Sequence, residues 1–294
     1  MLFKVLVDNN EGLDPHLQSE HGLSIYFEMD GFKWLLDVGA SGKFAENAEV
    51  LGVDISDVDY LILSHAHADH TGGLSTFLQL NSKAKVFLSA KIDGRKYYST
   101  RRGGRRDISI DYNLLSAYPD RFELISENTW LSPSVWLLTH IPDNFAVPKA
   151  NATLYADDKK DDFSHEIAVV VEESSGKTIL SSCSHHGLLN TLSAVSGPVH
   201  SYIGGLHLVN SNPAMQAVDA GSTNSPALAS APLLQYETPK DLAAIAETIR
   251  QTYPGLTIYT GHCTGSDAFR MLKAGLGEGI VQFHTGFCSE DHEA

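Results

Sequence analysis

Short apolar runs of strand length recur along most of the chain. They lie at residues 1–7, 23–29, 32–39, 58–64, 84–89, 134–140, 167–173, 177–183, 199–209 and 256–260. The Asp30-Gly31 pair joins two of these runs, which is a strong signal for a tight hairpin. The run at 58–64 is continuously apolar, as is typical of a strand buried on both faces.

Helical patterns alternate with these runs. They cover residues 43–51, a segment that begins near 70, residues 239–251 with Pro239 near the start, and a segment that ends at 276. Strands and helices alternate in both halves, without a repeat or a dividing linker. This order predicts one domain over residues 1–294, with two sheets packed together and helices outside them.

Two segments depart from this regular pattern. Residues 90–128 are less periodic and contain the dense basic stretch "RKYYSTRRGGRRD". Residues 210–235 are rich in Ser, Ala, Asn and Pro, and Asp219 is their only charged residue. A long segment of this composition predicts an inserted loop or a lid.

The net charge of −15 narrows the range of partners, because phosphate backbones and anionic membranes attract basic surfaces. We therefore expect neither a nucleic-acid nor a membrane partner, and any anion binding must be local. No apolar run approaches the length of a membrane span, and the first residues do not resemble a signal peptide. The three cysteines form no CxxC pair. A cytoplasmic protein is the expectation.

The chemistry is concentrated in "SHAHADH", directly after the apolar run at 58–64. His65 and His67 lie two positions apart, so both rings can point to one side of an extended segment and bind one cation. Asp69 and His70 follow as the chain turns into a helix, which can direct them at a second position. Imidazole and carboxylate ligands suit zinc, iron or manganese. A polar helix cap with incidental histidines accounts poorly for such a cluster.

The stretch "SHAHADHTGGL" resembles the HxHxDH signature of the metallo-β-lactamase superfamily, and the likeness extends from "LLDVG" to "GHCTG". The resemblance implies an α+β fold, a four-layer αββα sandwich. It also implies two divalent metal ions, zinc above all with iron or manganese as alternatives, at the open edge of the sandwich. The motifs "LVDNN", "EHGLSI", "SCSHHG" and "GGLHL" resemble one branch, the 7,8-dihydropterin-6-methyl-4-(β-D-ribofuranosyl)-aminobenzene-5′-phosphate synthase-like proteins.

The resemblance also implies a set of metal ligands: His65, His67, Asp69, His70, Cys183, His185 and His262. Cys183 stands where the superfamily usually has a bridging aspartate, and an ordinary buried thiol explains it equally well. The histidine usually found before the strand at 167–173 has no good match, since His165 and Glu166 are both displaced. His185 therefore completes the first site in this assignment, and His262 completes the second. His186 has no role in it.

Other residues are candidates for supporting roles. Asp8, Asn9 and His21 can hydrogen-bond to the ligands, although turn chemistry also explains the Asp8-Asn9 pair. His207 can bind substrate, orient a ligand or serve the fold. The basic residues Arg101, Arg102, Arg105 and Arg106 can form a solvated surface or bind a phosphorylated substrate, with Tyr97 and Tyr98 beside them able to stack on a flat ring.

Three functions fit these features. The first is an enzyme, a metal-dependent hydrolase of an ester or phosphoester, in which Asp69 is both a metal ligand and the acceptor of a proton from water. The second is a transferase that joins a pterin to a ribosyl-aminobenzene phosphate. The third is a metal-dependent sensor or binding protein without turnover. The first two imply a small-molecule substrate, phosphorylated or pterin-like.

Overall fold

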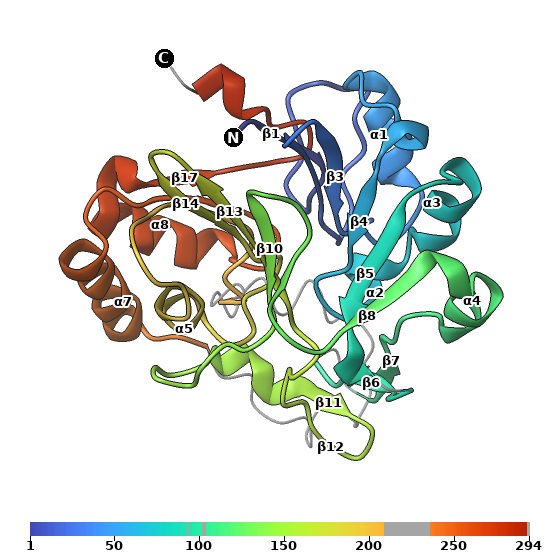
Figure 1. The fold of residues 1–294 in the computed structure, drawn as a ribbon. Coiled ribbons are helices and arrows are strands. Elements are labelled where there is room, and N and C mark those ends of the chain that lie inside the picture. The colour runs from blue at the N-terminus through green and yellow to red at the C-terminus, as the bar shows by residue number, and fades with distance from the viewer. Residues whose placement is uncertain (93, 102–103, 209–235, 293–294) are drawn as a thin grey trace.

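A computed structural model describes residues 1–92, 94–101, 104–208 and 236–292. Residues 210–235, predicted as an inserted loop or lid, lie outside these ranges. Two large sheets pack face to face, and helices cover both outer surfaces (Figure 1). No helix in the described ranges is both long and apolar enough to cross a bilayer.

The first sheet contains the N-terminal strands. Its order is β1 (Phe3–Val7), β2 (Ser24–Met29), β3 (Phe32–Leu36), β4 (Tyr60–Ile62), β5 (Lys85–Ser89) and β8 (Phe122–Ile125). The predicted hairpin is present, because Met29 pairs with Phe32 across the Asp30-Gly31 turn. Asp30 and Gly31 have φ values of 55° and 76°, as a two-residue turn with the right twist requires.

The second sheet contains the C-terminal strands. Its order is β17 (Ile280–Gln282), β16 (Thr257–Thr260), β15 (Val199–Ile203), β14 (Gly176–Leu180), β13 (Ala168–Glu173), β10 (Val135–Leu138) and β9 (Thr129–Trp130). Strands β14 to β17 run parallel, while β13 runs antiparallel to β14. The antiparallel strands lie toward one edge of this sheet.

The strands of both sheets are buried on both faces, so the core has three apolar layers. One layer lies between the two sheets, and one lies between each sheet and its outer helices. In β13, Val169 and Val171 pack between the sheets, whereas Ala168 and Val170 face the helices of the second half. In β3, Trp34 faces the other sheet and Leu35 faces the helices of the first half. Successive side chains of these strands point to opposite faces, and both faces are buried. The strand sequences are therefore continuously apolar and do not alternate between apolar and polar residues.

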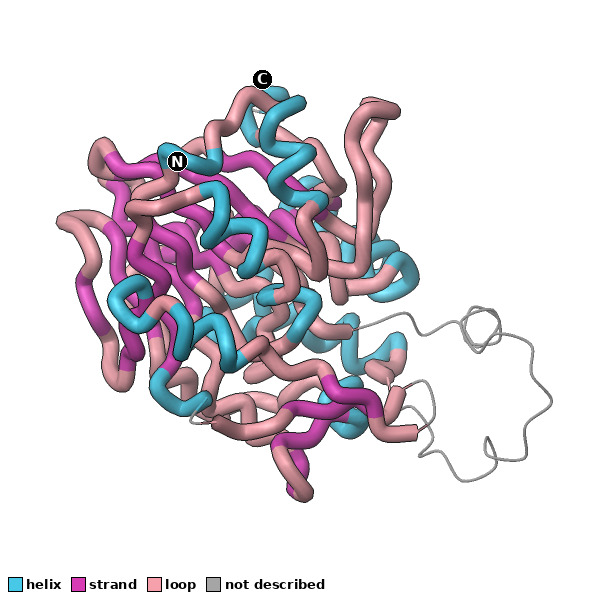
Figure 2. The backbone as a smooth tube through the Cα atoms, turned by 90° about the vertical axis from the view of Figure 1, so that its right-hand side faces the viewer, coloured by secondary structure: helices cyan, strands magenta, loops and turns pink. Residues whose placement is uncertain are grey.

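Helices form the outer layers. Helices α1 (Lys43–Val50) and α3 (Leu74–Leu80) pack on the first sheet, and α5 (Leu188–Ser193), α7 (Pro239–Thr252) and α8 (Ser266–Leu276) pack on the second. The turned view shows helices in front of the strands (Figure 2). Pro239 stands at the start of α7, where Thr238 and Asp241 form a capping box. The predicted four-layer αββα sandwich is confirmed.

The region 90–128 is more ordered than its sequence predicts. It contains β6 (Tyr97–Ser99), β7 (Arg106–Asp107), α4 (Tyr112–Ala117) and the edge strand β8. β6 and β7 join β11 (Leu154–Ala156) and β12 (Lys159–Lys160) in a small sheet of order β12-β11-β6-β7. Strands of two or three residues are too short to show a periodic pattern.

The helix predicted from residue 70 is interrupted. Helix α2 (Ala68–Thr71) ends at Gly72-Gly73, and α3 begins afterwards. A Cβ atom on Gly73 would lie 2.2 Å from the Val38 carbonyl oxygen, so this turn packs against β3's end only because it has no side chains. Short 3-10 helices lie at Ile55–Asp57, Ala90–Ile92, Pro119–Arg121, Lys149–Thr153, Gly277–Gly279 and Ser289–His292.

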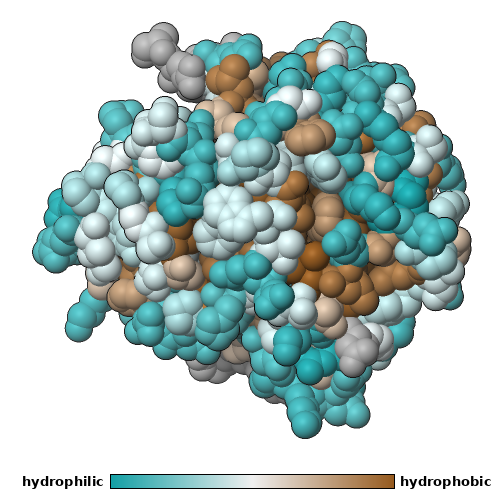
Figure 3. Space-filling view, viewed as in Figure 1, coloured by the Kyte–Doolittle hydropathy of each residue, from teal (hydrophilic) through white to brown (hydrophobic). Residues whose placement is uncertain are grey.

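The edge strands carry exposed apolar side chains. Leu124 on β8 is 54% exposed and Trp130 on β9 is 57% exposed. On the face shown in Figure 3, hydrophobic surface gathers near the middle of the molecule, between hydrophilic margins.

One edge of the sandwich receives the carboxyl ends of strands from both sheets. β1, β3 and β4 run in the same direction in the first sheet, and β14, β15 and β16 are parallel in the second. The residues that follow these strands are the polar ones singled out by the sequence. Open sheets commonly bind ligands beyond the carboxyl ends of their strands.

Candidate metal centre

The motif loop leaves β4 in an extended conformation and turns into α2. The backbone of His67 is extended, with φ −81° and ψ 142°, and His70 lies one turn later within the helix. The rings of His65 and His67 lie 4.6 Å apart, and His65 and His70 lie 4.2 Å apart. The loop therefore gathers its imidazoles at one point, as the spacing predicts.

The first group of candidate ligands consists of His65, His67 and His185, whose ligand atoms lie within 4.8 Å of one another. Nε2 of His65 and Nε2 of His185 are buried and have no hydrogen-bond partner in the part of the chain that the structure describes. Such nitrogens are unfavourable in a protein interior unless something binds them. Three imidazole ligands with an open position are a common arrangement for a catalytic zinc ion.

The second group consists of Asp69, His70 and His262, again within 4.8 Å. Asp69 Oδ2 lies 3.6 Å from His262 Nε2 and 3.8 Å from His70 Nε2, and the two Nε2 atoms are 3.1 Å apart. Both imidazoles are buried, whereas the Asp69 side chain is 24% exposed. Asp69 is thus the ligand candidate of this group that is reachable from solvent.

Cys183 lies between the two groups. Its Sγ atom is 3.2 Å from His70 Nε2, and it forms a third close set with His65 and His70. Sγ of Cys263 lies 3.4 Å from Sγ of Cys183, so the fold brings together two cysteines that are far apart in the sequence. Both are free thiols. Burial and then the neighbouring Cys263 raise the pKa of Cys183 well above its usual value, so a metal ion would have to displace a proton there.

The electrostatics keep most of the imidazoles neutral. Burial, with help from neighbouring rings, lowers the pKa of His65, His185 and His262 well below the usual value. His70 differs: burial opposes its charge, but the carboxylates of Asp69 and Asp37 outweigh burial and raise its pKa to about 9. Neutral imidazole is the form that binds metal.

Partners from outside the cluster hold the candidate ligands. His70 Nδ1 donates to Asp37 Oδ2 at 2.7 Å, and His262 Nδ1 donates to Asn9 Oδ1 at 2.9 Å. Asp8 accepts the backbone N–H of His262 at 2.7 Å, and burial raises the pKa of Asp8 to about 7. His21 Nε2 lies 3.4 Å from Asp69 Oδ2. The structure thus brings Asp8, Asn9 and His21 into contact with the centre.

Several contributing residues carry no evident signal in the sequence. Asp37 follows β3 in "LLDVG" and also accepts the N–H and hydroxyl of Ser64. Asn151 accepts from His185 Nδ1 at 3.1 Å. Glu166 accepts the backbone N–H groups of His185 and His186. Only the position of Asp37 at the end of an apolar run could have pointed to it.

Several residues around the candidate metal centre have a left-handed backbone conformation. Residues other than glycine adopt positive φ at Asp37, Phe163, Ser184, His207 and His262, with values of 47° to 60°. This left-handed conformation is disfavoured for residues with a Cβ atom, and it persists where the surroundings impose it.

The arginines separate into different environments. Arg101 Nη2 lies 3.4 Å from His207 Nε2, and the His207 ring lies 4.1 Å from that of His185. Arg105 instead pairs with Asp158 at 2.8 Å and stacks over Tyr98. Arg106 is exposed on β7, and Arg102 lies outside the described residues. Of the arginines described, Arg101 is the one that the fold brings to the cluster.

The two tyrosines are not open platforms. Tyr97 is fully buried, with its ring 4.3 Å from that of His165, and Tyr98 is covered by Arg105. Stacking of a substrate ring on this pair, one of the alternatives that the sequence left open, has no support in the geometry.

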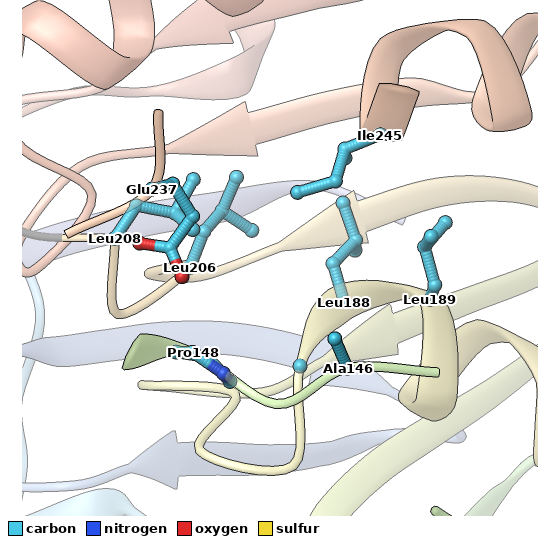
Figure 4. Close-up of a pocket in the computed structure, with 9 residues that line it drawn as sticks. Ala146, Pro148, Leu188, Leu189, Leu206, Leu208, Glu237 and Ile245 are labelled. Atoms are coloured by element: carbon cyan, nitrogen blue, oxygen red, sulfur yellow. The ribbon is translucent and has the colours of Figure 1, made fainter. Parts of the chain in front are cut away.

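An apolar pocket adjoins the cluster. It is lined by Ala146, Pro148, Gly187, Leu188, Leu189, Leu206, Leu208, Glu237 and Ile245. Figure 4 shows Glu237 beside Leu206 and Leu208, across from Leu188 and Leu189. Burial raises the pKa of Glu237, whose Oε2 has no hydrogen-bond partner within residues 1–92, 94–101, 104–208 and 236–292. The pocket lies next to the site because Leu206 and Leu208 flank His207.

Comparisons with known proteins agree with the fold described above. The sequence model of the metallo-beta-lactamase superfamily matches residues 20–123. The crystal structure of Tm1679, a metal-dependent hydrolase of the beta-lactamase superfamily, superposes with a TM-score of 0.73 at 24% identity over 98% of both chains. This chain is a metallo-β-lactamase-fold protein.

Two relatives of this metallo-β-lactamase-fold protein differ in how much of its chain they match. The 7,8-dihydropterin-6-methyl-4-(beta-D-ribofuranosyl)-aminobenzene-5′-phosphate synthase of Methanocaldococcus jannaschii is 25% identical over 96% of this chain and 93% of its own. A metal-dependent hydrolase of Staphylococcus haemolyticus is 42% identical, but over 29% of this chain and 35% of its own. The branch resemblance therefore spans nearly the whole protein.

The residues present fit a metal centre. In the first group, the Nε2 atoms of His65 and His185 are buried without a partner among the described residues, as expected of metal ligands, and Asp69 and Cys183 add an oxygen and a sulfur donor to the cluster. The metallo-β-lactamase fold places these groups at the edge where both sheets end.

We predict that His185→Ala lowers bound zinc by about one equivalent per chain, because it removes one of three imidazoles from the first group. Elemental analysis of the purified, metal-loaded protein measures this. His186→Ala is the matched control, since the His186 side chain hydrogen-bonds the Phe163 carbonyl outside the cluster. Full occupancy in His185→Ala would remove His185 from the ligand set.

We also predict that Cys183→Ser makes the bound metal more sensitive to chelators, because a serine hydroxyl is a much weaker ligand than a thiolate. The rate of metal transfer to a chromogenic chelator gives the readout. Cys288→Ser controls for loss of a thiol elsewhere, since Cys288 lies near the C-terminus and pairs with Lys4 in a β-bridge. Equal transfer rates in both variants would leave Cys183 as a core thiol.

Proposed function

We propose that this protein is a metal-dependent hydrolase whose site holds two divalent metal ions, with zinc favoured, and acts on an ester or phosphoester. The observation that carries the proposal is the pair of adjacent ligand groups, His65/His67/His185 and Asp69/His70/His262, with Cys183 between them. Two adjacent ligand groups beside a partly exposed carboxylate, Asp69, suit a site where two metal ions activate water. The three free thiols also fit the expected cytoplasmic setting.

Divalent ions held there would lower the pKa of a water molecule and polarise the scissile group. The chain's own residues would complete the site. Asp69 is partly exposed and is within 4 Å of three imidazoles, so we assign it as both a ligand and the acceptor of a proton. Asp37, Asn9 and Asn151 orient the histidines, which keeps the ligand geometry ready before substrate arrives.

Arg101 and His207 are the best-placed residues for an anionic substrate group. Arg101 Nε is buried and has no partner among the described residues, and its Nη2 lies 3.4 Å from Nε2 of His207 on the rim of the cluster. A guanidinium group forms charge-assisted hydrogen bonds with phosphate oxygens. We therefore favour a phosphorylated substrate over a neutral ester.

A transferase is the second candidate. The Methanocaldococcus jannaschii relative, which aligns over 96% of this chain, is a synthase whose name contains a pterin and a 5′-phosphate. In that reaction class Arg101 would hold the phosphate, and the ligand set would activate a leaving group in place of water.

The decisive experiment loads the metal-free protein with zinc, manganese or iron(II) and measures hydrolysis of bis(4-nitrophenyl) phosphate, 4-nitrophenyl phosphate and 4-nitrophenyl acetate. We expect metal-dependent turnover that Asp69→Asn lowers by about 10²- to 10⁴-fold, the usual contribution of a positioned acid or base. Asp143→Asn is the control, because the Asp143 side chain is 73% exposed.

Other outcomes favour the other candidates. Joining of a pterin to a ribosyl-aminobenzene phosphate, without hydrolysis of the aryl esters, would support the transferase. Binding of two metal ions without turnover in either assay would support a sensor or binding protein.

We predict that Arg101→Ala raises the KM for 4-nitrophenyl phosphate by about tenfold or more, since a charge-assisted hydrogen bond contributes roughly 1.5–3 kcal/mol. KM for 4-nitrophenyl acetate and the metal content should stay unchanged. Arg270→Ala on α8, with its side chain 75% exposed, is the control. Equal effects on both substrates would show that Arg101 serves the fold.

A further inference from the structure

Four of the five candidate ligand histidines share one hydrogen-bond arrangement. In each, Nδ1 is held by an oxygen atom, and Nε2 is left facing the cluster. The pairs are His65 with Ser64 Oγ at 2.7 Å, His70 with Asp37 Oδ2 at 2.7 Å, His185 with Asn151 Oδ1 at 3.1 Å and His262 with Asn9 Oδ1 at 2.9 Å. Metal-binding histidines usually have their second ring nitrogen fixed in this way.

His67 is the exception, and its neighbour is a buried carboxylate. Nε2 of His67, not Nδ1, lies 3.4 Å from Oδ2 of Asp161. The pair is slightly long and is not aligned as a full hydrogen bond. The Asp161 side chain has no exposed surface, which is unfavourable for a carboxylate unless it is well partnered.

The hydrogen bonds of His165, the second histidine beside Asp161, determine which of its ring nitrogens carries the proton. His165 Nδ1 accepts the backbone N–H of Ala66 at 3.1 Å, so the ring proton of a neutral His165 must be on Nε2. That Nε2–H points at Asp161 Oδ2, 3.1 Å away. His165 then has no free lone pair for a metal ion, although His67, Asp161 and His165 lie close enough together to form a candidate ligand group.

Asp161 is therefore an acceptor that other groups hold in place. Oδ1 accepts the backbone N–H of Phe163 at 2.9 Å, while Oδ2 accepts from His165 and faces His67. The contacts form a closed path from Ala66 through His165 and Asp161 to His67. This path ties the motif loop to the segment that precedes β13.

We propose that Asp161 is a positioning residue for the first metal site: held by His165, it accepts Nε2–H of His67 and so turns Nδ1 of His67 toward the ion. His67 would then bind through the opposite nitrogen from the other four histidines. The inference rests on the proposed metal centre and is independent of the substrate. It assigns a role to the pair Asp161 and His165, which the ligand pattern of the sequence leaves unused.

The test measures metal affinity and does not depend on turnover. In Asp161→Asn, the amide can take two orientations. Its NH2 group would then face the N–H donors of His165 and His67, or its oxygen would face them as a weaker acceptor than a carboxylate. Competition with a chromogenic chelator should show zinc affinity at one site reduced by about 10- to 100-fold, with the other site unchanged. The absorption spectrum of the cobalt(II)-substituted protein should change at the same site. Asp162→Asn is the matched control, because the neighbouring Asp162 side chain is 61% exposed and pairs with Arg95.

A second pair of variants separates positioning from folding. His165→Gln can keep both hydrogen bonds, accepting from Ala66 and donating to Asp161, so it should retain parental zinc affinity. His165→Leu keeps neither, and should match Asp161→Asn. Thermal unfolding of the metal-free variants shows whether the fold itself has changed.

The outcomes are distinct. Parental affinity and an unchanged cobalt spectrum in Asp161→Asn would overturn the proposal, as would equal weakening of both sites together with a lower unfolding temperature. Loss of affinity in His165→Gln as large as in His165→Leu would also overturn it. A parent protein that binds two ions but hydrolyses nothing would refute the proposed hydrolase and leave the positioning role in place.

Discussion

The candidate metal centre depends on one constraint: ring nitrogens must be held, buried, at the edge where the two sheets end. Nitrogens at His65 and His185 without partners are costly in a protein interior, and no local helix or turn could hold them there. The apolar layer between the sheets, with Trp34, Val169 and Leu180 among its members, supplies the rigidity that keeps the two sets of strand ends in register. The centre is therefore a property of the whole sandwich.

Sequence reasoning succeeded where the signal is local. The HxHxDH motif places its ligands within six positions, and a continuous apolar strand before it sets their direction. Cys183, His185 and His262 came from family resemblance, because nothing in their spacing relates them to the motif. The structure brings all of them together, and their function stays a proposal that the metal measurements test.

Sequence reasoning failed where an interaction joins distant segments. Along the chain, the candidate ligands that contact Asp37, Asn151 and Asp161 lie 33, 34 and 94 positions away, respectively. Each of the three looks like an ordinary polar residue in its own segment. The small sheet around β6 and β11 escaped for a related reason, since two- and three-residue strands carry no periodicity. Likewise, four arginines that look equivalent in "RRGGRR" cannot be separated until Arg105 is seen to pair with Asp158.

The left-handed residues around the centre limit which side chains these positions tolerate. Glycine adopts that conformation at no steric cost, so it would relieve the backbone at Ser184, His207 and His262. At Ser184 such an exchange removes a hydroxyl that contacts Thr191 and Tyr202. At His207 and His262 it would also remove an imidazole. At these two histidines a disfavoured backbone conformation, which costs roughly 1–3 kcal/mol each, coincides with an imidazole at the candidate metal centre. The backbone alone therefore favours glycine at both positions, independently of what the ring binds.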